Sequence, residues 1–357
     1  MKINKYLAIN KTMNQEILNQ DISDFVARCS YGEEFKNKRI AVTGATGLIG
    51  SITVKCLAAL NEKYDLGMTL YCVVRNIAKA NLLLDISSPS VVIVPISNFG
   101  TIETSIVSGK IDYIIHTAAP TASSYFAQKP VETYDGVVGL TRLILEKAKD
   151  LHCDSFVYLS SLEVYGQILD DANFVSEETQ GYVNPLSARS SYSMGKRAAE
   201  CLCYAYFSEY KMPVKIARLA QTFGAGVSLD DKRVFAYIAK AAMAGEDVCL
   251  DTPGAVKRDY CYTIDAVDAI LRILLFGGNG EAYNVANEQT YISVKDMAEC
   301  VLNLYSPKNQ VKIGMGDVSC YPPATKTKMS SDKLKKLGWH PSYDLMEMFS
   351  RLINWYK

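Results

Sequence analysis

The sequence predicts an α/β protein: a Rossmann-like, doubly wound parallel sheet with a smaller C-terminal α/β lobe. From residue 38 onward, short β-branched runs alternate with longer amphipathic runs, which is the pattern of repeated βαβ units. A glycine-rich turn follows the first β-run and opens a helical stretch. The chain has 357 residues, of which 49% are hydrophobic, and this is enough to fill the core of such a fold.

Three regions are expected along the chain. Residues 1–37 form an N-terminal extension with helical apolar spacing between Ile17 and Val26, and they could pack on the body or act as a lid. Residues 38–220 form the Rossmann domain, with strands expected in KRIAVT, TLYCVV, SVVIVPI, IDYIIHTAA, SFVYLSS and VKIARLA. Residues 221–357 form mainly the smaller lobe, with segments interleaved with the Rossmann domain, because Gly, Pro and Asp interrupt the regular pattern there.

Composition argues against several classes of function. The 38 basic residues balance 38 acidic residues, so we expect neither nucleic acid nor a membrane as a partner. The ten cysteines show no CxxC spacing and no signal-peptide pattern is present, so we expect a cytoplasmic protein with reduced thiols. His116, His152 and His340 have no Cys or carboxylate at ligand spacing, so no metal site is expected.

The segment VTGATGLIG is the first candidate site. Gly44, Gly47 and Gly50 lie between a β-run and a helical run, where glycines let the backbone approach a pyrophosphate at a helix N-terminus. The alternative is that they serve only helix–strand packing. We expect a dinucleotide cofactor to be held here by these glycines together with other residues of the loop and of the fourth strand end, namely Thr46, Leu48, Ile49 and Ala118.

The second strand ends in CVVRN, where NAD-binding proteins carry an acid for the ribose. Arg75 stands near that position, and a guanidinium there can pair with the 2′-phosphate of NADP. A solvated arginine at a strand end is the other interpretation. The cofactor is therefore expected to be NAD or NADP.

A redox site is indicated by SSYSMGKRAAE. Tyr192 and Lys196 are four residues apart in a helical pattern, so they share one face. A cation beside a phenol lowers its pKa, so the phenol can take a proton from a substrate hydroxyl while a hydride leaves the same carbon. Ser161, at the end of the preceding strand, is the expected hydrogen-bond partner of Tyr192. Such a pair alone could be chance surface residues, but the glycine motif upstream favours catalysis.

These motifs, together with IIHTAAP, LSSLEVYG, ARLAQTFGAG, RDYCYTIDAVDAI and KLKKLGWHP, resemble the extended short-chain dehydrogenases/reductases of the nucleotide-sugar epimerase/dehydratase group. The resemblance runs from about residue 38 to the end. It implies a nicotinamide cofactor that oxidises a sugar hydroxyl, usually at C4. It also implies a nucleotide-sugar substrate and a homodimer built from helices near residues 131–149 and 191–210.

Within this group, Glu163 distinguishes between reactions. Family members that act at C5 beside a transient 4-ketone carry Ser/Thr-x-Glu-Val-Tyr-Gly, in which the carboxylate acts as a base or shapes a decarboxylation site. Leu162 stands where dTDP-glucose 4,6-dehydratases carry an aspartic acid, whereas NPLSARSSYSMGKRAAE is similar to a run in UDP-glucuronate decarboxylases. The resemblance therefore favours decarboxylation, with 4,6-dehydration and 4-epimerisation as alternatives. Glu163 could also merely cap the turn after the strand.

Four residues are expected to bind the substrate. Arg189 belongs to the decarboxylase-like run, and Gln221 replaces an asparagine of the family's Arg-x-x-Asn run. Arg233 and Arg258 match positions at which the family contacts the diphosphate, and a planar guanidinium suits two phosphate oxygens. Either arginine could instead be a surface residue.

A non-enzymatic NADP-binding sensor is a further alternative, because this fold alone does not establish activity.

Overall fold

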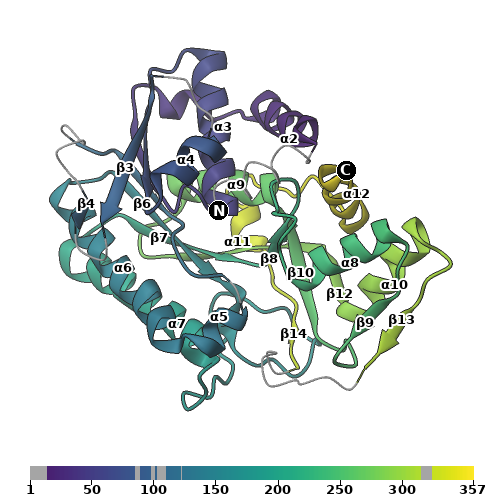
Figure 1. Cartoon of the computed structure of the whole chain (residues 1–357). Helices are drawn as coiled ribbons and strands as arrows, with labels where there is room; N and C mark the ends of the chain where they lie inside the picture. Colours follow the sequence, from purple (N-terminus) through teal and green to yellow (C-terminus); the bar gives the residue numbers. More distant parts are fainter. Residues whose placement is uncertain (1–13, 85–88, 98–100, 103–109, 122, 315–323) are drawn as a thin grey trace.

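The computed structural model describes residues 14–84, 89–97, 101–102, 110–121, 123–314 and 324–357, and residues 1–13 of the predicted extension lie outside it. Its centre is a sheet in the order β11-β7-β6-β5-β1-β2-β3-β4 (Figure 1). Neighbouring strands are parallel except for β3 and β4. In chain order the strands are β1 (Arg39–Thr43), β2 (Thr69–Val74), β3 (Val91–Ser97), β4 (Thr101–Ile102), β5 (Tyr113–His116), β6 (Ser155–Ser161), β7 (Val214–Leu219) and β11 (Ala282–Val285).

Helices cover both faces of this sheet. One apolar cluster packs α3 (Leu48–Tyr64) and α9 (Thr263–Phe276) on one face, and a second packs α6 (Pro130–Asp150) and α7 (Ser190–Tyr210) on the other. The short helices α4 (Ile77–Leu84) and α5 (Ser123–Gln128) follow β2 and β5. This arrangement confirms the predicted doubly wound Rossmann-like fold and the predicted strands.

The smaller lobe is built around a second sheet. In it β10 (Lys257–Tyr262) pairs with β8 (Gln221–Phe223), β12 (Asn287–Ser293) and β14 (Lys326–Thr327). A separate pair, β9 (Val248–Leu250) and β13 (Val311–Ile313), extends this lobe. Its helices are α8 (Val234–Ala244), α10 (Val294–Tyr305), α11 (Asp332–Lys335) and α12 (Leu345–Tyr356). Because α9 and β11 return to the central sheet, the chain crosses between the two sheets more than once.

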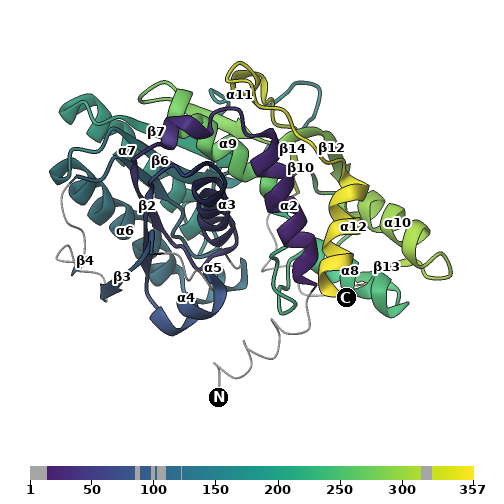
Figure 2. The ribbon, with the colours of Figure 1, turned by 90° about the horizontal axis from the view of Figure 1, so that it is seen from above.

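The N-terminal extension forms α2 (Gln15–Arg28), followed by the 3-10 helix η1 (Gly32–Phe35). Asn14 caps α2 by accepting a hydrogen bond from the amide of Glu16, and the apolar side chains of Leu18, Phe25 and Val26 are buried. The helix packs against α3, α9 and α12 (Figure 2). Of the two interpretations of this segment, packing on the body is therefore the one that the structure shows.

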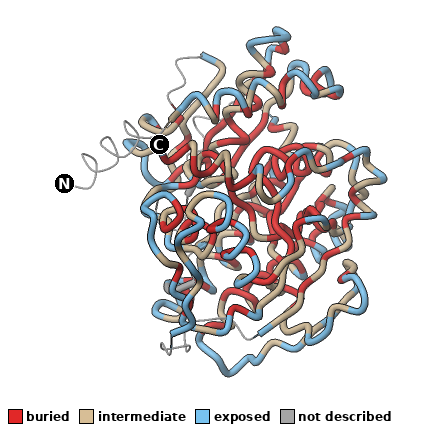
Figure 3. The backbone as a smooth tube through the Cα atoms, turned by 90° about the vertical axis from the view of Figure 1, so that its right-hand side faces the viewer, coloured by how far each residue is buried: buried red, intermediate tan, exposed pale blue. Residues whose placement is uncertain are grey.

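The carboxyl ends of the parallel strands place the site. Buried residues run through the middle of both lobes (Figure 3). The parallel strands β1, β5 and β6 are adjacent, so the turns after them lie along one edge of the sheet. In a doubly wound sheet this edge is where ligands bind, and every predicted cofactor and catalytic residue lies on it or on the helices that leave it.

Candidate active site

The glycine loop after β1 is a close-packed cradle. Gly44 has φ of +67°, and a Cβ atom there would lie 2.8 Å from the Cα of Ala118 after β5. A Cβ on Gly50 would lie 2.4 Å from the carbonyl oxygen of Gly44. Gly47 is the N-cap of α3 and supplies no side-chain cap, so amide N–H groups of the first helical turn remain available to an anion.

These features fit a dinucleotide pyrophosphate. Thr46, Leu48 and Ile49 are partly exposed in the same turn, whereas Gly50 is buried. The loop could therefore bind the pyrophosphate through its backbone, with Ala118 closing the opposite side.

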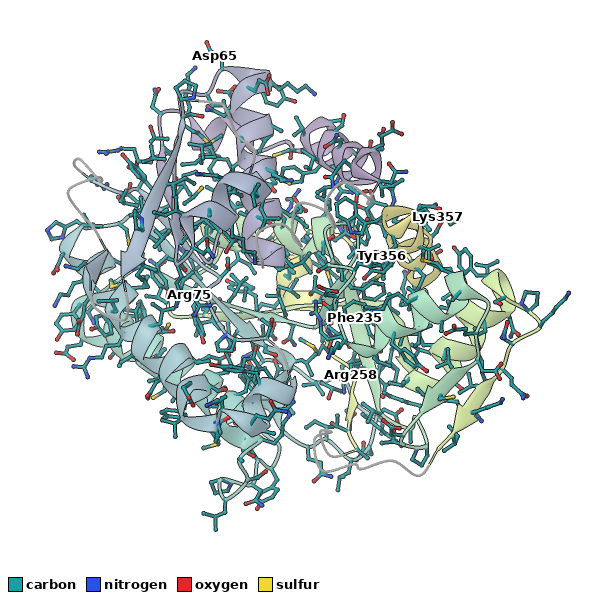
Figure 4. All side chains as sticks on the ribbon, viewed as in Figure 1. Asp65, Arg75, Phe235, Arg258, Tyr356 and Lys357 are labelled. Carbon is teal, nitrogen blue, oxygen red and sulfur yellow. The ribbon has the colours of Figure 1, made fainter. Side chains whose placement is uncertain are left out.

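Arg75 lies at the end of β2 and is exposed (Figure 4). Its charge acts on Lys79 in α4, whose pKa is lowered first by burial and then by Arg75. Two cations thus lie where a doubly wound fold binds the adenosine ribose.

Tyr192 and Lys196 are brought to the end of β6 by α7. Both are buried, with 8% and 3% of their surfaces exposed. Burial raises the pKa of the Tyr192 phenol, the Glu163 carboxylate raises it further, and a hydrogen bond with Ser161 lowers it. Ser161 thus acts on the Tyr192 phenol, and its role as the hydrogen-bond partner of Tyr192 stays a prediction. The phenol of the ligand-free protein holds its proton.

Lys196 is held by groups from β6. Its Nζ donates to the carbonyl oxygen of Leu159 at 2.6 Å. It also lies 4.6 Å from the ring centroid of Tyr158 and 5.8 Å from that of Tyr192. Burial lowers the pKa of Lys196 to about 7, although Glu200 acts in the opposite direction. Near neutral pH this ammonium can therefore exchange a proton, which suits a group that supports acid–base work at Tyr192.

Glu163 lies in the 3-10 helix η3 (Leu162–Tyr165) directly after β6. Both of its oxygens are engaged: Arg189 donates to them at 2.5 and 3.0 Å, and the Ser193 hydroxyl donates at 2.8 Å. Burial by itself would raise the pKa of Glu163, but Arg189, Ser193 and the charge of Arg258 outweigh burial and lower it. Glu163 is thus an ionised, neutralised carboxylate rather than a free base.

The remaining predicted substrate residues come from the smaller lobe. Arg258 on β10 is partly exposed, and its Nε is buried without a hydrogen-bond partner among the described residues (Figure 4). Gln221 opens β8, next to β10. Arg233 is the residue before α8, and its guanidinium is engaged by Asp231, with an Nη2–Oδ2 distance of 2.6 Å. The charge of Arg233 also lowers the pKa of Tyr192.

Sequence reasoning missed three contributors to this site. Ser193 follows Tyr192 directly, but a hydroxyl on a helix carries no distinct signal. Phe126 on α5 stacks on Tyr192 at 4.1 Å between ring centroids, and the Arg189 guanidinium lies 5.0 Å from its centroid. Tyr158 beneath Lys196 looks like an ordinary strand residue, and only its alternation with Leu159 could have suggested that it faces α7.

Two other features lie outside the site. His116 is buried between the Thr43 and Thr141 hydroxyls, at 2.6 and 3.1 Å from its ring nitrogens, so it is a satisfied core residue. A separate cavity of about 380 Å³ is lined partly by Arg197 and Arg218 of α7 and β7. Both arginines are already engaged, Arg197 by backbone carbonyls and Arg218 by Glu200.

In the described ranges no cluster of His, Cys, Asp or Glu could hold a metal ion.

Comparison with known proteins identifies the family. Residues 40–286 match the model of the NAD dependent epimerase/dehydratase family. The chain belongs to this family.

Its relatives carry out several reactions. The chain is 31% identical over 314 residues to UDP-glucuronic acid decarboxylase 3 of Arabidopsis thaliana, covering 87% of this chain and 86% of that protein. It is 26% identical over 328 residues to the dTDP-D-glucose 4,6-dehydratase of Homo sapiens, covering 90% of each. The fold matches UDP-glucuronic acid 4-epimerase from Bacillus cereus, crystallised with UDP-glucuronic acid and NAD, at a TM-score of 0.75 and 20% identity, over 89% of this chain and 98% of that chain.

These matches confirm the predicted family, an enzymatic role and dependence on a nicotinamide cofactor. The enzyme belongs with nucleotide-sugar decarboxylases, dehydratases and epimerases. Within the described part of the chain, no helix is both long and apolar enough to cross a membrane.

Proposed function

We propose that the protein decarboxylates UDP-glucuronate, or a closely related nucleotide-linked uronic acid, through transient oxidation at C4. The observation that carries this proposal is the state of Glu163. Arg189 and Ser193 engage both of its oxygens, so it is poorly placed to take a proton from C5. Leu162 beside it cannot protonate a departing hydroxyl. Dehydration needs both of these functions, whereas decarboxylation of a β-keto acid needs neither.

The first half of the reaction uses Tyr192. The nicotinamide dinucleotide, when bound, supplies the acceptor and later the donor of a hydride. As a phenolate, Tyr192 takes the proton of the C4 hydroxyl, so the proton that the phenol holds in the ligand-free protein must first pass to solvent. Ser161 lowers the pKa of this phenol. Lys196, fixed on the carbonyl of Leu159, stabilises the phenolate by its charge. The C5 carboxylate then lies β to a ketone.

The second half follows from that ketone. The bond between C5 and the carboxylate carbon breaks, carbon dioxide leaves, and the electron pair moves into an enolate at C4. C5 then gains a proton from water. The ketone is reduced again by the hydride first removed, and Tyr192 returns its proton to the C4 oxygen. Arg258 is available to hold the carboxylate or the diphosphate, because its Nε has no hydrogen-bond partner among the described residues.

Three further assignments belong to this proposal. The cofactor is NAD or NADP, and the adjacent charges of Arg75 and Lys79 support NADP. Residues 38–220, with α9 and β11, bind the cofactor, and most of residues 221–357 bind the nucleotide sugar. Gln221 and Arg233 contribute to this second surface.

The purified protein should remove one carbon dioxide from UDP-glucuronate without added oxidant or reductant, as followed by mass spectrometry of the nucleotide sugar. Tyr192→Phe should lower kcat by at least about 10²-fold, because the proton acceptor is lost. It should bind the cofactor as the wild type does.

Other products would contradict the assignment. Loss of water from dTDP-glucose or GDP-mannose would indicate a dehydratase, and unchanged mass with altered retention would indicate an epimerase. No turnover of any sugar, with cofactor still bound, would favour the sensor.

Arg258→Met should raise KM for UDP-glucuronate by about tenfold to hundredfold, because a charge-assisted hydrogen bond contributes roughly 1.5–3 kcal/mol. Affinity for the cofactor should not change. Steady-state kinetics and a cofactor titration measure the two effects.

The matched control is Lys257→Met. Lys257 precedes Arg258 on β10 but pairs with Asp171 at 3.5 Å. Its removal should leave KM unchanged. Equal increases in KM for both variants would show that positive charge anywhere on β10, and not Arg258 specifically, binds the substrate.

We also propose a homodimer formed through α6 and α7. Large apolar side chains on these helices are exposed, namely Val131, Tyr134, Tyr204 and Tyr210. Sedimentation of the full chain should give a dimer, and Tyr204→Arg should weaken it. Leu169→Arg alters an apolar residue that is 72% exposed outside these helices and should leave the dimer intact. A monomeric wild type would contradict the proposal.

A further inference from the structure

The N-terminal helix α2 is joined to the smaller lobe by a buried carboxylate. Asp21 is fully buried, with 0% of its surface exposed. It accepts a hydrogen bond from the Tyr262 hydroxyl at 2.5 Å and another from the Arg351 guanidinium. Tyr262 ends β10 and Arg351 lies on α12, so one side chain of α2 bridges two elements of the smaller lobe. The helices α2 and α12 lie side by side (Figure 2).

Tyr262 also contacts the segment between β8 and α8, residues 224–233, which we term the linking loop. The Tyr262 hydroxyl accepts a hydrogen bond from the amide of Ala225 at 3.4 Å while it donates to Asp21. Its ring lies so close to Gly224 that a Cβ there would be 2.3 Å from a ring carbon. Asp21 is thus separated from the linking loop by a single side chain.

The end of α12 holds the same loop from a second direction. The Trp355 indole donates to the carbonyl of Val227 at 2.8 Å, and the Tyr356 hydroxyl donates to that of Ser228 at 3.2 Å. The amide of Asn14, before α2, donates to the carbonyl of Trp355 at 3.0 Å.

The linking loop ends at the substrate surface. Asp231 accepts from both the amide and the guanidinium of Arg233, the last residue of the loop. On its other side the loop packs on α3, because a Cβ on Gly226 would lie 2.9 Å from Ile52. The linking loop therefore contacts α3 and ends at Arg233, so its position sets where the Arg233 guanidinium points.

We propose that Asp21 is a positioning residue for the nucleotide sugar: through Tyr262 and Arg351 it holds the linking loop in the conformation that presents Arg233 to the diphosphate. The identity of the ligand rests on the proposed function. The bracing of the loop does not.

The test compares two α2 variants of the full chain. Asp21→Ala removes the contact to the loop. Arg28→Met removes the ion pair of the same helix with Asp265 on α9, whose Nη2–Oδ1 distance is 3.0 Å, and leaves the loop contacts in place. Hydrogen exchange of residues 224–233 should be faster in Asp21→Ala and unchanged in Arg28→Met. Asp21→Asn, which keeps an oxygen for Tyr262, should be intermediate and guards against a misfolded alanine variant.

Titration with UDP provides the functional readout. Asp21→Ala should bind UDP about tenfold more weakly, by the loss of roughly one charge-assisted hydrogen bond. Arg28→Met should match the wild type, and cofactor affinity should be unchanged in both. Unaltered exchange or UDP affinity in Asp21→Ala, or equal effects in Arg28→Met, would overturn the inference. A wild type that binds no UDP would contradict the proposed function, while the exchange data would still decide whether Asp21 braces the loop.

Discussion

The ion pair between Glu163 and Arg189 connects the two elements that build the candidate catalytic centre. Glu163 follows β6, which ends in Ser161, and Arg189 precedes α7, which carries Tyr192 and Lys196. Side chains of this pair are only 21% and 10% exposed. Removing one partner would leave an uncompensated buried charge, which is far more costly than the net gain from the pair. The pair therefore specifies how the end of β6 meets the start of α7.

The ion pair with Arg189 decides which of two roles Glu163 can have. In the proposed reaction a free Glu163 would be a base beside C5, whereas a neutralised Glu163 stabilises the site. The Nε of Arg258 has no hydrogen-bond partner among the described residues. Phe126, which stacks on Tyr192 and lies under Arg189, links the same residues from α5. In the proposed decarboxylation, the chemistry then depends on the ketone made at C4 and not on a second proton acceptor.

Much of this site was predictable from local patterns. The glycines of the β1 turn and the spacing of Tyr192 and Lys196 follow from backbone and helix geometry, which short stretches of sequence encode. The partner of Glu163 is 26 residues away and that of Asp21 is Tyr262, 241 residues away. Such contacts depend on how elements pack in three dimensions, so neither the neutralised state of Glu163 nor the buried contacts of Asp21 were visible in the sequence.

The central claim is that Glu163 orders the site and takes no proton from carbon. Glu163→Gln keeps the shape of the side chain and an oxygen for Arg189 but cannot act as a base. The decisive measurement is a single turnover of UDP-glucuronate with this variant, following reduced nicotinamide and released carbon dioxide together. We expect both rates to fall by about tenfold or less, as for one weakened charge-assisted hydrogen bond. Normal hydride transfer with carbon dioxide release or product formation slowed by more than about 10³-fold would contradict the account.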